Sequence, residues 1–417
     1  MSQEAREEVH ALVEHLFRHE AGRMLAALTR MFGLADFDPA EEVVQDAMVQ
    51  ALRQWPFRGV PDNPAAWLMR TARNKALDVL RRRTLFRRQE CDLDDQAAAS
   101  QEPVGDELAD DQLAMIFACC HPVLPAEARI ALTLKSVGGF GVAEIARAFL
   151  TQEATIAQRL VRAKRRLAED NVPLAVPPSA ELPERLDSVL RVIYLLFNEG
   201  YSAHQGEDLV RHDLCAEAIR LSLLLLSRPE TALPKVHALV ALMLLQASRL
   251  PTRQDAEGNL CLLANQDRSS WDKALISEGM HHLERAAAGE ELSEYHVQAA
   301  IAACHAVAPS YDATDWQRVL ALYDQLMAIA PSPVVLLNRA IALAMEEGPE
   351  AGLHALDAVH HDPAMRDYYL LPATRADLLL RLGQPEEAEA SYRHALTLPC
   401  TQPERRFLTK RLEECRR

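Results

Sequence analysis

Apolar residues recur at intervals of three and four along most of this chain, a spacing typical of amphipathic helices. The spacing predicts helical structure over residues 5–32, 39–54, 63–83 and 112–170, and shorter helices with short loops from 184 to 417. Asp38 and Pro39 suit the cap and the first helical position of the second of these helices. The pattern therefore predicts an all-α protein.

Two stretches of the C-terminal part depart from plain helical patterning. Arg249–Gln266 breaks the pattern, and Asp255–Asn259 resembles a turn, so a short hairpin is one interpretation. Further on, a weak repeat over about residues 334–400 relates segments that begin at Ala340 and Ala376, about one tetratricopeptide period apart. The second unit has small or aromatic residues where two helices would pack closely, at Ala376, Gly383, Ala388, Tyr392, Ala395 and Pro399. A generic helical hairpin is the alternative.

The segment Asn63–Arg83 carries the first chemical signal. At helical spacing its apolar stripe consists of Leu68, Met69, Ala72, Ala76, Val79 and Leu80. The opposite face holds Trp67, Arg70, Asn74, Asp78 and Arg81, with Arg73 at its edge. Cations bind phosphates, whereas amides and flat rings bind bases, so this face suits single-stranded nucleic acid. A solvated helix face with Trp67 packed under a loop is the alternative.

A second basic helix follows in Gly141–Leu167, which has the pattern of a helix-turn-helix. The first helix is predicted at about 142–150, the turn at Thr151 and Gln152, and the second helix at about 153–168. Ala146 would lie where the two helices cross, and Leu150 stands where such turns usually have glycine. The outward face of the second helix would present Thr155, Gln158, Arg159, Arg162, Arg165 and Arg166. A hydroxyl, an amide and a row of cations suit the major groove of duplex DNA.

Charge divides the chain unevenly. Its net charge is −15. Residues 1–172 carry 22 Lys and Arg against 26 Asp and Glu, a net of −4, and the remainder carries −11. Residues 90–111 hold nine acids and no Lys or Arg, which predicts a flexible acidic linker. The predicted domains are 1–89, the linker 90–111, the helix-turn-helix domain 112–172, a proline-rich connector 173–183 and a helical extension 184–417.

Other classes of function find little support in the residues. Cys119, Cys120 and His121 form the one cysteine cluster, and structural burial is favoured over a zinc site because no second ligand pair has suitable spacing. Histidines at 204, 212, 281 and 282 are scattered, and no phosphate loop or nucleophile motif is present. We therefore expect no enzyme activity, no cofactor and no metal. Without a signal peptide or an apolar run of membrane-spanning length, a cytoplasmic protein without a membrane partner is expected.

Taken in order, these motifs resemble a bacterial RNA polymerase sigma factor of the extracytoplasmic-function type. FDPAEEVVQDAMVQALRQWP resembles the helix that docks on the polymerase clamp, NPAAWLMRTARNKALDVLRRR the helix that reads the −10 element, and EIARAFLTQEATIAQRLVRAKRRL the −35 recognition motif. The resemblance covers residues 1–170. The remainder resembles the subgroup with a long helical extension and tetratricopeptide-like repeats, in which the extension is implied to regulate activity.

The resemblance implies particular roles. Contacts with core RNA polymerase would come from Glu41, Glu42, Gln45 and Asp46. The loop 56–64 would hold a flipped −10 base, and the −10 element of promoter DNA would meet Asn63, Trp67, Arg70, Arg73, Asn74, Lys75 and Arg81. The −35 element would meet Thr155, Gln158, Arg159, Arg162 and Arg165. The acidic linker would thread a basic channel of the polymerase.

Alternatives remain at this stage. The chain could be a stand-alone helix-turn-helix regulator with a helical sensor domain, which would need a symmetric dimer on a palindrome, or a tetratricopeptide-type scaffold. In the extension, YLLFNEGY at 194–201 and NQDRSSWD at 265–272 could form a small-ligand pocket, a docking patch or buried polar helix junctions. Docking is preferred, and the acidity of the extension predicts that it contacts the two basic helices.

Overall fold

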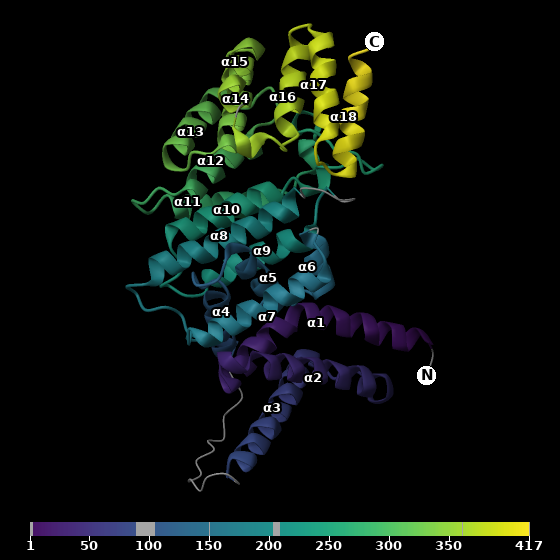
Figure 1. Ribbon diagram of the computed structural model, residues 1–417, viewed down its shortest axis with the longest axis vertical. Helices are drawn as coiled ribbons and strands as arrows, with labels where there is room; N and C mark the ends of the chain where they lie inside the picture. Colours follow the sequence, from purple (N-terminus) through teal and green to yellow (C-terminus); the bar gives the residue numbers. More distant parts are fainter. Residues whose placement is uncertain (1–2, 89–104, 150, 203–208, 361, 417) are drawn as a thin grey trace. The chain divides into compact units, whose positions relative to one another are not determined.

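The computed structural model describes residues 3–88, 105–149, 151–202, 209–360 and 362–416 (Figure 1). Within these ranges the chain forms eighteen α-helices and five short 3-10 helices, without a β-strand. The predicted all-α class is therefore confirmed. No helix in these ranges is long and apolar enough to cross a membrane.

The chain divides into two compact units, residues 1–193 and 194–417. The division falls inside helix α8, Leu182–Tyr201, rather than in the proline-rich connector 173–183. The first half of α8 belongs to the first unit because it is bonded there. Arg185 donates to the carbonyl of Phe117 at 2.7 Å, and the Ser188 hydroxyl donates to the carbonyl of Cys120 at 2.7 Å.

The first unit contains seven helices before α8. They are α1 (Gln3–Phe32), α2 (Phe37–Arg58), α3 (Pro64–Arg88), α4 (Gly105–Cys119), α5 (Ala126–Ser136), α6 (Val142–Ala148) and α7 (Glu153–Glu169). The 3-10 turn η1, Leu34–Asp36, leads directly into α2. Asp38 is thus not the cap of this helix, as the sequence had suggested, but lies in its first turn.

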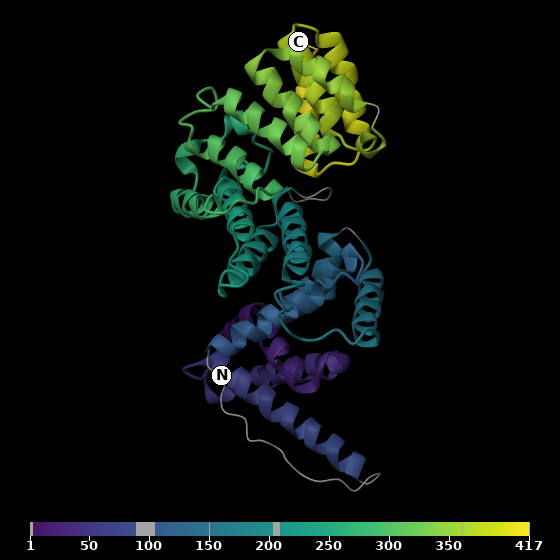
Figure 2. The ribbon, with the colours of Figure 1, turned by 90° about the vertical axis from the view of Figure 1, so that its left-hand side faces the viewer.

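Small residues bring α1, α2 and α3 together. Ala47 and Ala51 of α2 and Ala72 and Ala76 of α3 are fully buried, so the two backbones approach closely. On another side of α1, Gly22 allows a close approach to the end of α5, because a Cβ at this position would lie 2.0 Å from the carbonyl oxygen of Val137. In both views the C-terminal half of α3 extends beyond α1 and α2 (Figures 1 and 2).

Helix α4 begins earlier than the sequence suggested. Residues 105–111, predicted as the end of the flexible linker, form its first turns. Asp111 is buried and pairs with Arg30 of α1, so its charge is compensated inside the fold. Residues 89–104, the rest of the predicted linker, lie outside the described residues. One carboxylate of the acidic segment that was predicted to be a linker therefore holds α1 against α4.

The cysteine pair at the end of α4 is structural, as predicted. Cys119 and Cys120 are both buried. Burial raises the pKa of Cys119 well above its usual value and that of Cys120 to about 11. The Cys120 thiol lies 3.5 Å from the Thr133 hydroxyl of α5. Both side chains thus act as small apolar groups in the α4–α5 core.

The second unit surrounds one strongly apolar helix. Helix α10, Pro234–Ala247, has an almost continuous apolar sequence and is buried nearly throughout. It packs against α9 (His212–Leu225), α11 (Lys273–Ala286) and α12 (Glu294–Val307). The stretch after α10 contains three short 3-10 turns. It also contains an antiparallel bridge between Gln254 and Leu260 that closes a turn at 255–258, which is the short hairpin considered from the sequence in a minimal form.

The C-terminal helices pair in sequence order. They are α13 (Trp316–Ile329), α14 (Pro333–Glu346), α15 (Pro349–His360), α16 (Leu370–Arg381), α17 (Pro385–Thr397) and α18 (Gln402–Glu414). Of the repeat positions predicted to pack closely, Ala376, Ala388, Tyr392 and Ala395 share one buried cluster. Gly383 has φ of 73° in the turn between α16 and α17, a conformation that favours glycine.

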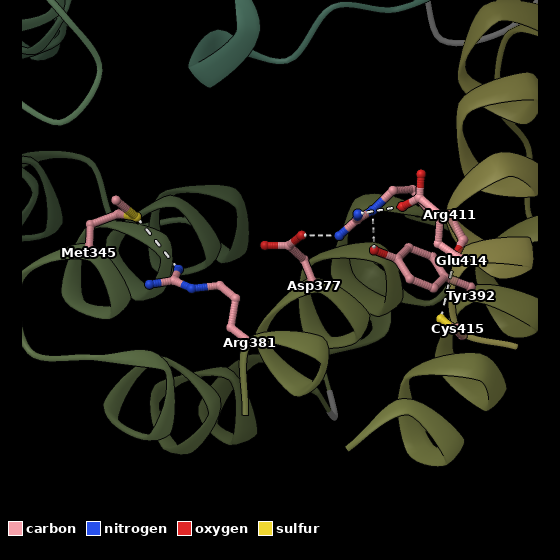
Figure 3. A network of polar contacts seen from close by, with 7 residues as sticks. All are labelled: Met345, Asp377, Arg381, Tyr392, Arg411, Glu414 and Cys415. Carbon is pink, nitrogen blue, oxygen red and sulfur yellow. Dashed lines mark hydrogen bonds and ion pairs between the residues drawn. The ribbon is translucent and has the colours of Figure 1, made fainter. Parts of the chain in front are cut away.

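Arg411 ties the last three helices together (Figure 3). Its guanidinium pairs with Asp377 of α16 at 2.8 Å and donates to the Tyr392 hydroxyl of α17 at 3.2 Å. It also pairs with Glu414 of its own helix at 2.7 Å. One planar cation with several donors thus fixes α18 against the preceding hairpin.

A buried histidine pair joins α10 to α11. The Nδ1 atoms of His237 and His282 lie 2.8 Å apart, and the two side chains are buried. Burial and the neighbouring His282 lower the pKa of His237 from 6.5 to about 4, and burial also lowers the pKa of His282. Both rings are therefore neutral at pH 7.

This pair predicts a loss of stability in acid. The unfolded chain takes up protons near pH 6.5, whereas folded His237 does so only near pH 4. The free energy of unfolding should therefore fall as the pH drops from 6.5 to 4, by up to about 1.4 kcal/mol per pH unit from His237, and the lowered pKa of His282 acts in the same direction. Denaturant unfolding measured across this range should show a shallower fall in His282→Gln. His354→Gln, a change at an exposed histidine of α15, should leave the slope unchanged, and equal slopes in all three proteins would contradict the assignment.

Candidate nucleic-acid interface

Helix α3 has the two faces that its sequence predicts. Leu68, Ala72 and Ala76 are fully buried, whereas Arg70 and Asn74 are exposed. Arg81, further along α3, is also exposed. The apolar stripe of α3 packs against α1 and α2. The face that carries the cations and the amide therefore points outward.

The aromatic residues on the two sides of the loop before α3 are placed differently. Trp67 is half-buried and meets the buried ring of Trp55 edge-on, with ring centroids 5.4 Å apart. Trp67 therefore braces α3 against the end of α2. Phe57, by contrast, is 75% exposed in the last turn of α2. Sequence reasoning missed Phe57, although an aromatic residue in a loop rich in Pro and Gly was the available signal.

Asn63 is the cap of α3. Its Oδ1 accepts a hydrogen bond from the backbone N–H of Ala66 at 3.0 Å, and its carbonyl accepts from Trp67 at 3.1 Å. The side chain satisfies one of the free N–H groups of the first turn. The amide nitrogen has no role in this contact. Asn63 is exposed, so the same side chain can cap the helix and present its NH₂ group outward.

Several cations on α3 have carboxylate partners. Lys75 pairs with Asp46 of α2 at 3.0 Å, Arg81 with Asp78 of its own helix at 3.6 Å, and Arg83 with Asp36 at 2.9 Å. The pairs of Lys75 and Arg81 are solvent-exposed, so each contributes little to stability and can open toward another anion. The Lys75–Asp46 pair also brings together a residue predicted to contact DNA and one predicted to contact polymerase.

The acidic face of α2 is exposed at three of its four predicted positions. Glu42, Gln45 and Asp46 are exposed. Glu41 is different, because its side chain is only 18% exposed and pairs with Lys164 of α7 at 2.7 Å. Lys164 also pairs with Asp38 at 3.0 Å, and its ammonium lies 5.1 Å from the centre of the Phe37 ring. One cation of α7 is thus directed at α2.

Helices α6 and α7 form the predicted helix pair. Ile145 and Ala146 of α6 and Ile156 and Leu160 of α7 are buried. Glu144 accepts a hydrogen bond from the backbone N–H of Gly141 at 2.7 Å and so caps α6. Helix α6 ends at Ala148, two residues before the predicted end, and Leu150 lies outside the described residues. The apolar stripe of α7 packs in this helix pair, and the other sides of the helix face solvent.

The outward side of α7 carries most of the predicted DNA-contacting residues. Exposed on it are Thr155, Gln158, Val161, Arg162, Arg165 and Arg166. Positions 158, 161, 162 and 165 share one face at helical spacing. Arg162 has no ion-pair partner among the described residues, and Arg165 pairs only with Glu169, at 2.7 Å. Val161, which sequence reasoning missed, is 65% exposed in the middle of this face.

Arg159 departs from this face. It is only half-buried rather than exposed, and it pairs with Glu127 of α5. Glu127 itself is open to solvent on the carboxylate side, with 73% of its side chain exposed. Arg159 is therefore positioned by α5, at the border between the core of the helix pair and the outward side of α7.

Comparisons with known proteins match these two helical regions. Residues 16–86 match the sigma-70 region 2 family, and residues 114–167 match sigma-70 region 4. The first range ends with the exposed face of α3, and the second ends with that of α7. The chain belongs to the sigma-70 family of RNA polymerase sigma factors.

Relatives of this sigma factor fall into two kinds. The ECF RNA polymerase sigma factor SigM of Mycobacterium tuberculosis is 31% identical over 155 residues, which are 37% of this chain and 74% of SigM. An uncharacterized protein of Rhizobium meliloti is 41% identical over 395 residues, 93% of this chain and 92% of the relative. Residues 185–287 match DUF6596, a family of unknown function. The sigma factor thus has a helical C-terminal part with its own family.

The cap at Asn63 gives a test of structure that is separate from DNA binding. Asn63→Ala removes the side-chain acceptor and should destabilise the first turn of α3 by about 1 kcal/mol, whereas Asn63→Asp keeps an acceptor and should not. Hydrogen exchange at the Ala66 amide should become roughly fivefold faster in Asn63→Ala alone. Equal exchange in both variants would show that the side chain does not cap the helix.

Proposed function

We propose that this sigma factor binds core RNA polymerase and directs it to promoters by reading a −10 and a −35 element. The observation that carries the proposal is the pair of outward faces, one on α3 and one on α7, in the two regions that match the family. Each face combines cations with amides, and each belongs to a helix held by a buried apolar stripe. A rigid helix can present such groups to DNA in fixed register.

In the proposal, α7 enters the major groove of the −35 duplex. Gln158 and Arg162 would contact base edges, because an amide pairs with adenine and a guanidinium with guanine. Val161 lies between them, and its exposed methyl groups suit the methyl group of thymine. Arg165 would bind phosphate after releasing Glu169, a solvent-exposed pair that costs little to open. Thr155 and Arg159 would contribute contacts at the two edges of this face.

In the proposal, α3 and the loop before it hold the −10 strand. Arg70, Arg73, Asn74, Lys75 and Arg81 would follow the phosphates and bases of the strand. Asn63 would offer its amide NH₂ to an unpaired base while Oδ1 keeps the cap of α3. Phe57, 75% exposed, offers a ring on which such a base can stack. Trp67 would act as a brace, since its ring already packs on Trp55.

Polymerase contact is proposed for the acidic face of α2, through Glu41, Glu42, Gln45 and Asp46. The similarity to SigM supports placing the protein among the sigma factors of the extracytoplasmic-function type. The extension from residue 184 is proposed to regulate activity, with the tetratricopeptide-like helix pairs as its scaffold. The net charge of −11 on residues 173–417 would attract the extension to the basic helices or to a basic partner.

Run-off transcription with core RNA polymerase over a promoter library tests the main proposal. Full-length protein should direct initiation at promoters with both elements. Arg162→Ala should lower initiation about tenfold, since a bidentate contact with a base contributes about 1–3 kcal/mol. The effect should shrink when the −35 element is scrambled. Arg393→Ala, which removes an exposed cation of α17, should have no effect.

The same assay separates the competing functions. Tight, sequence-specific binding by the protein without polymerase would favour a stand-alone regulator and would contradict the proposal. For the extension, the chain should be cut after Ile193 rather than in the connector, because the first half of α8 is bonded to α4. Unchanged polymerase binding and transcription by residues 1–193 would contradict a regulatory extension.

The contact of Lys164 with Glu41 predicts competition with polymerase. If Glu41 binds core polymerase, it must first leave Lys164, and a half-buried pair of this kind is stabilising by about 1 kcal/mol. Lys164→Ala should therefore raise the affinity for core polymerase roughly fivefold, and Glu41→Ala should lower it. Arg147→Ala, at an exposed cation of α6, is the control. Unchanged affinity in Lys164→Ala would mean that the contact does not compete.

A further inference from the structure

Three arginines gather around two aromatic rings in the second unit. Arg249 follows α10, Arg253 ends the next 3-10 turn, and Arg268 begins another. The Arg253 guanidinium lies 3.9 Å from the centre of the Tyr201 ring, and that of Arg268 lies 4.7 Å from the centre of the Trp271 ring. Arg249 lies 5.8 Å from both rings. We call these five residues the arginine cluster.

Within the described part of the chain, the positive charge of the arginine cluster lacks an acidic partner. Among the residues that the structure describes, no carboxylate forms an ion pair with Arg249, Arg253 or Arg268. Arg249 donates to the Tyr201 hydroxyl and to Gln246 Oε1, the latter at 2.9 Å. Arg268 donates to the carbonyls of His305 and Ala308, the latter at 2.8 Å. Burial and the nearby Arg249 lower the pKa of Arg268, as expected where like charges crowd together.

Several donors of the arginine cluster also lack an acceptor among the described residues. Trp271 is only 2% exposed, yet its indole Nε1–H has no hydrogen-bond partner there. Arg249 Nε and Arg268 Nη2 are likewise buried without a partner in the described part of the chain. Leaving a buried donor unsatisfied is costly. Arginine and tryptophan side chains can only donate, so acceptor oxygens with negative charge are what the cluster lacks.

The neighbouring ring of His305 does not supply that charge at neutral pH, and the pKa of Tyr201 reflects the positive field of the arginines. Burial and the cations Arg249 and Arg268 lower the pKa of His305 to about 4, so this ring is neutral. Burial raises the pKa of Tyr201, but Arg249 and Arg253 outweigh it and hold the value below its usual range. The field of the arginines is thus strong enough to draw Tyr201 toward its anionic form.

We propose that the arginine cluster is a binding site for a small anion that presents carboxylate or phosphate oxygens. The planar guanidinium groups match such oxygens in pairs, and the aromatic rings hold them in place before the anion arrives. The five residues come from 194–201, the stretch after α10 and 265–272, and all lie within residues 185–287, which match a family of unknown function. The inference is independent of promoter binding.

Calorimetric titration of the full-length protein with inorganic phosphate, and separately with citrate, tests the site. Chloride should keep the ionic strength constant, so that general charge effects stay the same. Saturable binding is expected for at least one probe, with a rise of about 2–4 °C in the unfolding midpoint near ten times the dissociation constant. Arg253→Gln should weaken binding at least tenfold, and Trp271→Phe, which keeps an aromatic ring but loses the N–H, a few-fold.

The control is Arg339→Gln, at an arginine of the same unit that already pairs with Asp324. Affinity should be unchanged in this variant. Equal affinity of the wild type and Arg253→Gln for both probes would overturn the proposal, as would an equal loss in Arg339→Gln. If Arg253→Gln does not fold, Trp271→Phe and Tyr201→Phe decide, because wild-type affinity in both would also overturn it. The proposal would also be overturned if neither probe binds to the wild-type protein.

Discussion

Close packing of helices through small residues is the constraint on which this structure depends. Alanines fill the contact between α2 and α3, and a Cβ on Gly352 of α15 would lie 2.4 Å from the Cβ of Ala344 of α14. Gly279 of α11 has a similar contact with Leu245 of α10, at 2.8 Å. A chain with only 5% aromatic residues cannot fill wide gaps between helices, so the helices must approach closely to exclude water.

This packing decides what each helix shows to its surroundings. Because Leu68, Ala72 and Ala76 are buried, helical geometry alone places Arg70 and Asn74 on the outward face of α3. The same holds for α7, where burial of Leu160 fixes the direction of Arg162. The outward faces that we propose recognise DNA are thus by-products of core formation, and their fixed geometry comes from the rigidity of the core.

Much of this could be predicted because it is local. Helical periodicity places the stripe and the outward face of α3 and α7, and a change in composition marks the acidic segment. Partners distant in the chain carry no such signal. Lys164 pairs with Glu41 across 123 residues, Asp111 with Arg30 across 81, and the arginine cluster draws on three separate stretches. The local sequence pattern shows that a charged residue is present. Its ion-pair partner is known only from the fold.

The buried thiols of α4 have a consequence for chemistry outside transcription. Oxidants and alkylating agents attack the thiolate, and burial raises the pKa of Cys120 to about 11, which disfavours that form at neutral pH. Burial likewise raises the pKa of Cys215, to about 12. Both thiols are also enclosed by the core, so they are poorly suited to be the groups through which the protein would sense oxidants.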